Sequence, residues 1–183
     1  MKSVWINTLA WLGAVLVALA LAFAGPTESS VMGRLPALMA KRLDQQPVLV
    51  PQGFPAERTL ALIAFDRSHR EAIDSWVRGL GLHANATNIP WVRMPVLNDP
   101  GNPTTRGEIE NRLLLRFPGA HERATLVPLF TDRAAFVRSV GLSGTQSAVA
   151  VVVNRRGEVL ARAEGPFDVD KADALLETLG AKH

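Results

Sequence analysis

The densest group of chemically capable side chains follows directly after an apolar run. It comprises Asp66, Arg67, Ser68, His69 and Arg70. The next residues repeat at helical spacing, so this group falls at a predicted helix N-terminus, where free N–H groups and basic side chains could hold a carboxylate or phosphate. A simpler interpretation is that Ser68 and Glu71 form a capping box, with Asp66 as a further cap and the basic side chains in solvent. Capping alone explains the spacing, and we favour it.

Other chemistry at this group needs geometry that the sequence does not favour. Nucleophilic catalysis by His69 with Asp66 or Ser68 requires nucleophile, base and orienting acid in one hydrogen-bonded row. Neighbours in one helical turn rarely align in that way, and no nucleophile-elbow motif is present. The histidines lack the spacing of metal ligands; they are His69, His83, His121 and His183. The sequence predicts no catalytic residue, no metal and no cofactor.

A second candidate surface combines a tryptophan with arginines. Trp91 is flanked by Pro90 and Arg93, and an exposed aromatic beside an arginine is typical of interfaces, although a core tryptophan is the more common case. The segment 106–123 mixes glutamates with four arginines, which are Arg106, Arg112, Arg116 and Arg123. Such a mixture is usually a solvated face stabilised by i, i+4 pairs. It is also our best prediction for a surface that binds a protein partner.

Composition excludes two classes of function. The chain of 183 residues contains no cysteine, so thiol-disulfide exchange and thiol peroxidase activity, which need a thiolate, are excluded. The formal net charge of +3 is weak for a nucleic-acid binder, and the basic residues are scattered among acids. We therefore expect no nucleic-acid partner.

The N-terminal segment 1–27 is predicted to be a signal anchor or a signal peptide. Residues 4–25 form a predicted hydrophobic helix about 33 Å long, enough to cross a bilayer. The small residues around Phe23 equally fit cleavage near Ala24. Lys2 favours a cytoplasmic N-terminus, so either outcome places the predicted domain 28–183 outside the cytoplasm.

The elements that must position these side chains alternate between strands and helices. Apolar runs and turn signals predict strands over 59–65, 89–97, 125–130, 148–153 and 158–164, with helices after the first three and at the C-terminus. Pro90 and Pro95 predict that the second strand lies at a sheet edge or is interrupted. Thr105 and Glu108 predict a second capping box. This order predicts an α/β fold with a mixed central sheet flanked by helices.

The C-terminal half carries a resemblance to a known fold. A strand ending in Asp132, a helix closing on Gly141, a strand over 149–153, a turn at Gly157 and a return strand resemble the redoxin form of the thioredoxin-like superfamily. The resemblance implies a thioredoxin-like fold over about residues 34–180, but both cysteine positions are lost. In addition, Gln146-Ser147 stands where such proteins usually carry a cis-proline.

Within that superfamily the chain is most similar to bacterial relatives of the mitochondrial ATP synthase assembly chaperone. The residues behind this comparison include Leu62–Arg67 with Trp76, segment 106–123, and Leu129–Arg133 with Phe136. The resemblance implies a non-enzymatic assembly or interaction factor whose partner is a membrane protein. Together with the N-terminal segment, a bacterial origin predicts a single-pass inner-membrane protein with a periplasmic domain, or a periplasmic or secreted protein if the leader is cleaved near Ala24. The alternative is a small-anion binder or cysteine-independent enzyme that uses the helix N-terminus at Ser68–Arg70.

Overall fold

Strand β4 (Arg58–Ala64) lies at the centre of the structure because side chains from both of its faces are buried. Leu60 and Leu62 pack in one apolar core, whereas Ala61 and Ile63 pack in another on the opposite face. An uninterrupted apolar strand of this kind is expected where both faces of a sheet are covered. The predicted strand over 59–65 is thus confirmed with bounds shifted by one residue.

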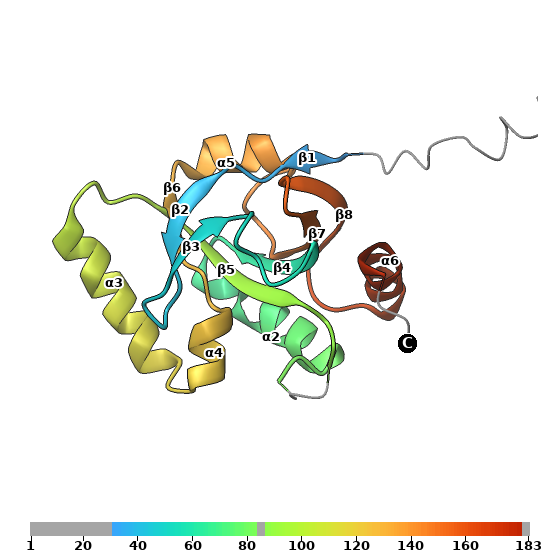
Figure 1. Cartoon of the computed structure of the whole chain (residues 1–183), viewed down its shortest axis with the longest axis horizontal. Coiled ribbons are helices and arrows are strands. Elements are labelled where there is room, and N and C mark those ends of the chain that lie inside the picture. The colour runs from blue at the N-terminus through green and yellow to red at the C-terminus, as the bar shows by residue number, and fades with distance from the viewer. Residues whose placement is uncertain (1–30, 84–86, 181–183) are drawn as a thin grey trace, which may run out of the picture. The chain divides into compact units, whose positions relative to one another are not determined.

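The computed structural model describes residues 31–83 and 87–180. Their central sheet has the order β1–β8–β7–β4–β5–β6 (Figure 1). Strands β4, β5 and β6 are parallel to one another, whereas β7 is antiparallel to both of its neighbours, β4 and β8, so the predicted mixed sheet is confirmed. The bounds of the main-sheet strands are β1 Gly33–Arg34, β4 Arg58–Ala64, β5 Trp91–Asn98, β6 Leu129–Thr131, β7 Val149–Asn154 and β8 Glu158–Glu164.

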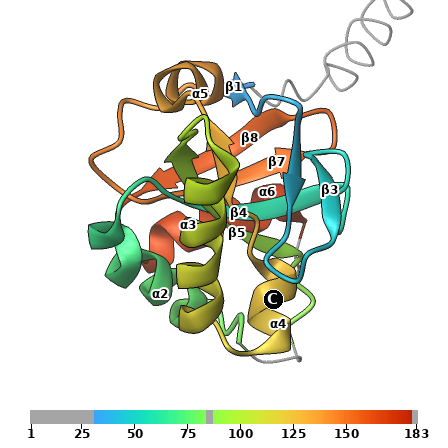
Figure 2. The same ribbon diagram turned by 90° about the vertical axis from the view of Figure 1, so that its left-hand side faces the viewer.

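Helices cover both faces of the sheet, as Figures 1 and 2 show. One core contains α5 and a separate hairpin of β2 and β3, and the other contains α2 and α6. Helix α3 contributes no buried residue, and its partly buried Leu113 and Leu114 pack only on a small third cluster. The remaining bounds are β2 Leu38–Lys41, β3 Pro47–Val50, η1 Arg67–His69, α2 Arg70–Gly79, α3 Pro103–Arg116, α4 Ala120–Thr125, α5 Arg133–Val140 and α6 Val169–Leu179.

Strand β5 corrects one prediction. It lies uninterrupted between β4 and β6 instead of at an edge. Pro95 is tolerated within the strand because the two neighbouring strands pair with different parts of it. Strand β4 pairs with residues 91–95, and β6 pairs with residues 96–98. Pro95 is therefore the last residue paired with β4 and precedes the first residue paired with β6.

One further local prediction was wrong, and another is confirmed with changed bounds. Helix α3 is capped by Asn102, whose side chain accepts a hydrogen bond from the Thr105 N–H, so Thr105 is not the first residue of a capping box. The third predicted strand is shortened to β6 because Thr125 belongs to α4 and Leu126 forms only an isolated bridge with Arg93. Asp132 and Gly141 do bound α5, as predicted.

The predictions for the leader, residues 1–27 and the span 4–25, lie outside the described residues. Within 31–83 and 87–180, none of the helices is both long enough and apolar enough to traverse a bilayer.

Candidate functional site

The turn between β4 and α2 is closed by Asp66. Its carboxylate accepts a hydrogen bond from the Ser68 N–H at 2.9 Å and caps the short helix η1, so α2 begins only at Arg70. The predicted Ser68–Glu71 capping box is therefore wrong, because the earlier aspartate takes the capping position. The Ser68 hydrogen bonds are the main reason that the pKa of Asp66 is lowered, with smaller contributions from His69 and Arg133.

His69 points inward. It is 6% exposed, and its Nδ1 accepts a hydrogen bond from the Phe65 N–H at 3.2 Å. Its ring also meets the Phe65 ring edge to face, with 6.4 Å between centroids. His69 therefore lies beneath the surface that its neighbours present, and its Nδ1 is occupied by the backbone.

A cleft of about 650 Å³ opens beside this turn, between the ends of β4 and β5 and the helices α2 and α3. Figure 2 shows α3 in front of the sheet, with α2 to its left. Apolar residues form much of the lining, among them Phe65, Ile73, Pro95, Leu97, Ile109, Leu113 and Phe117. Six arginines also line it, and they are Arg67, Arg70, Arg93, Arg112, Arg116 and Arg133. Asp66 is the one carboxylate among the described residues that line it.

Aromatic rings and one ion pair hold several of these arginines. The guanidinium carbons of Arg93 and Arg116 lie 5.2 and 5.4 Å from the centre of the Phe117 ring. The guanidinium carbon of Arg133 lies 5.8 Å from the centre of the Phe65 ring. Such cation–π contacts fix a guanidinium without neutralising it.

Only part of the positive charge is balanced. Arg93, with a side chain 13% exposed, donates to Asp74 at 3.0 Å. The pKa of Arg116 is lowered, first by burial and then by the charges of Arg70 and Arg93. In addition, the buried Nε of Arg133 has no hydrogen-bond partner in the described structure. A site with crowded arginines and an open N–H donor is suited to an anion.

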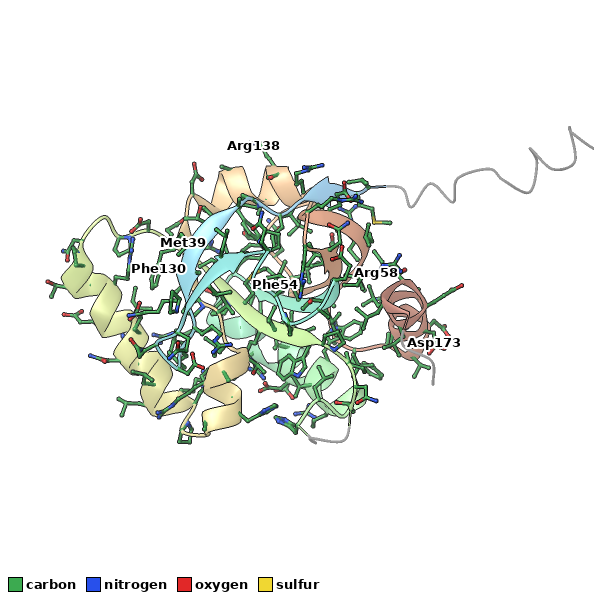
Figure 3. All side chains as sticks on the ribbon, in the orientation of Figure 1. Met39, Phe54, Arg58, Phe130, Arg138 and Asp173 are labelled. Atoms are coloured by element: carbon green, nitrogen blue, oxygen red, sulfur yellow. The ribbon has the colours of Figure 1, made fainter. Side chains whose placement is uncertain are left out.

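Four of the sequence candidates are not among the residues that line this cleft: the inward-pointing His69, and Arg106, Arg123 and Trp91. Arg106 pairs with Asp99 through two contacts of 2.8 Å and lies over Phe130, which is labelled in Figure 3. Arg123 donates to main-chain carbonyls at the end of α3. Trp91 is half-buried and borders a second hollow of about 340 Å³. In contrast, Asp66, Arg67, Arg70, Arg112 and Arg116 all line the cleft.

Sequence reasoning missed Arg93 and Arg133 as site residues. A signal for Arg133 was present, because Asp132-Arg133 follows β6 as Asp66-Arg67 follows β4. Both strands are parallel to β5, so the residues that follow them gather at one edge of the sheet. In the sequence, Arg93 stands out only as the neighbour of Trp91 in a candidate interface, and nothing there connects it with the turn after β4. A metal-binding cluster of His, Asp or Glu is absent from residues 31–83 and 87–180.

Comparisons of the whole architecture define the class of fold. The solved structures similar to this chain include a putative electron transfer protein from Aquifex aeolicus, with a TM-score of 0.56, 9% identity, and coverage of 82% of this chain and 96% of that one. BsSco, a member of the Sco family of cytochrome c oxidase assembly proteins, gives a TM-score of 0.52 at 14% identity, covering 82% and 95%. Copper-bound ScoI from Arabidopsis thaliana gives 0.52 at 12%, covering 82% and 99%.

The chain therefore has a thioredoxin-like α/β fold, as predicted, and it has no cysteine. No protein-family model matches the chain, and no curated protein matches it with significance. At identities this low, similarity of structure establishes the fold alone.

Proposed function

We propose that this protein is a non-catalytic binding module that assists the assembly of a membrane protein outside the cytoplasm. The observation that carries the proposal is the cleft itself. In thioredoxin-fold proteins the reactive cysteines lie where a strand meets a helix N-terminus, and here that place holds Asp66, Arg67 and Arg70 beside an arginine-lined hollow. The scaffold is present, whereas the chain contains no cysteine.

Charge and surface chemistry support binding through this face. Four arginines on the β4–α2 turn and on α3 are exposed, and arginine is enriched in protein interfaces. An anionic partner would relieve the repulsion from Arg70 and Arg93 that, after desolvation, contributes to the lowered pKa of Arg116. The membrane-protein partner and the extracytoplasmic location rest on the apolar segment 4–25 and on the resemblance to relatives of the ATP synthase assembly chaperone.

The alternative function, capture of a small anion at the helix N-terminus of Ser68–Arg70, has less support. The carboxylate of Asp66 already accepts the Ser68 N–H, so a small anion would meet a negative charge there. This alternative predicts a thermal shift with small carboxylates or phosphates that Arg67→Ala and Arg70→Ala abolish.

Site-specific photo-crosslinking in membranes tests the proposal. A probe at Leu115 on α3, which is 85% exposed, should capture one identified membrane protein. A matched probe at Val169 on α6, which is 62% exposed, should not capture it. Figure 1 shows these two helices at opposite ends of the view.

The same adduct should disappear when Arg112 and Arg116 are replaced by glutamate. Identical adduct patterns from the two probe positions, or an adduct that survives this charge reversal, would contradict the proposed function.

A further inference from the structure

Three of the six arginines of the cleft fall into two groups, each held by one aromatic ring. Arg93 and Arg116 share the Phe117 ring at one end, whereas Arg133 lies over Phe65 at the other. From this division, and resting on the proposed function, we infer that the cleft binds an extended acidic peptide segment. That segment carries two carboxylates on one face with an apolar side chain between them.

The sheet register gives the separation of the two groups. Arg93 is paired with Leu62 of β4, and Phe65 lies three residues further along the chain. At about 3.3 Å per residue, the backbone levels of Arg93 and Phe65 are roughly 10 Å apart along the strand direction. In an extended peptide, residues i and i+4 lie on one face about 13 Å apart, and the long arginine side chains can cover the difference.

The cleft between the two levels is apolar. Pro95 is paired with Ala64, one residue before Phe65, and it lines the cleft together with Leu97 and Ile109. Residue i+2 of the same peptide face would lie above this floor, where an apolar side chain is removed from water. The distribution of charge and apolar surface therefore matches the order acid, spacer, apolar, spacer, acid.

The hydrogen-bond donors of the cleft are distributed along it, and this distribution favours a peptide over a compact anion. A single phosphate is held by donors that converge on one point, whereas these guanidinium groups come from the β4–α2 turn, β5, α3 and α5. A lipid with one anionic headgroup would likewise balance only one end. Moreover, the orphaned Nε of Arg133 provides a buried donor at the end away from Phe117.

Fluorescence anisotropy with the purified full-length protein in detergent tests the inference. The probe is a labelled nine-residue peptide with glutamate, serine, leucine, serine and glutamate at its centre. We expect saturable binding that weakens with added salt. Replacing both glutamates by glutamine, or the leucine by serine, should each weaken binding at least about tenfold. Equal binding of the three peptides, or no binding of the first, would overturn the inference.

Variants locate the site. Arg116→Glu and Arg133→Glu should each weaken peptide binding at least about tenfold. Arg138→Glu, on the same helix as Arg133 but at the outer surface labelled in Figure 3, should leave binding unchanged. An equal loss in Arg138→Glu would show non-specific charge attraction and overturn the inference. So would displacement of the peptide by pyrophosphate, or by phosphatidylglycerol vesicles, at a lower concentration than unlabelled peptide.

The two proposals fail separately. Peptide binding without a membrane-protein crosslink at Leu115 would contradict the proposed function, whereas the inference that the cleft binds an acidic peptide would stand. A crosslink without peptide binding would remove only the peptide inference.

Discussion

Replacement of His69 by alanine tests whether the His69 side chain holds Phe65, a residue that lines the cleft, in position. The His69 Nδ1 is the acceptor for the buried N–H of Phe65, the residue over which Arg133 lies. A buried N–H without an acceptor costs about 1–3 kcal/mol. Loss of the ring's contact with Phe65 adds about 1 kcal/mol. We therefore expect His69→Ala to lower the free energy of unfolding by roughly 2–4 kcal/mol.

Urea denaturation followed by far-UV circular dichroism measures this loss directly. For a domain of this size, it corresponds to a fall in Tm of roughly 4–16 °C. His69→Asn is the matched control, because its carboxamide oxygen can accept the same hydrogen bond. It should retain roughly half of the lost stability. The slope with urea should stay the same in all three proteins, since the folded and unfolded surfaces change little.

A loss below about 0.5 kcal/mol in His69→Ala would refute the reasoning, since such values are typical of surface substitutions. An equal loss in the alanine and asparagine variants would assign the effect to packing instead of the hydrogen bond. In either case the hydrogen bond from the Phe65 N–H to His69 would not be what holds Phe65 in position.

Two further predictions concern the rest of the domain. In urea denaturation, Gly141→Ala should destabilise the protein by about 2 kcal/mol or more, because φ is +74° and the new Cβ would collide with the Met32 carbonyl. The matched control is Gly101→Ala, where φ is +70° but the space around the new Cβ is open, and it should cost only about 1 kcal/mol. Hydrogen bonds from neighbouring side chains lower the pKa of Glu158, so its contribution to stability is present above the unfolded pKa and is lost as pH falls through the folded value. The stability difference between wild type and Glu158→Gln should therefore shrink from pH 7 to about pH 3, and a constant difference would contradict this assignment.

The sheet was predictable because its signals are local and redundant. The apolar run at β4 and the β-branched run at β7 each specify a buried strand without reference to the rest of the chain. Asp132 and Gly141 likewise bound α5 through the chemistry of capping residues.

Competing local signals explain the errors. Asp66 and Ser68 are both good capping residues, as are Asn102 and Thr105, and in each case the earlier one accepts the hydrogen bond. Spacing alone does not decide between overlapping caps. The position of β5 depends on how β4 and β6 divide its length, and that division is a property of the sheet.

The cleft depends on long-range structure in the same way. Arg67 and Arg112 can be identified as basic residues in the sequence, but only the parallel order of β4, β5 and β6 brings them together with Arg93 and Arg133. Sequence patterns identified side chains that could bind, whereas the fold determines which of them share one site.

Because these arginines are far apart in the sequence, folding is needed to bring them into one binding site, and binding is therefore coupled to folding. An unfolded chain does not present the arrangement, so an occupant binds only the native state, and at 100 times its Kd it adds about 2.7 kcal/mol of stability. The protein should then resist heat and proteases better when its partner is bound than when it is free. Its abundance in a cell would consequently follow that of its partner.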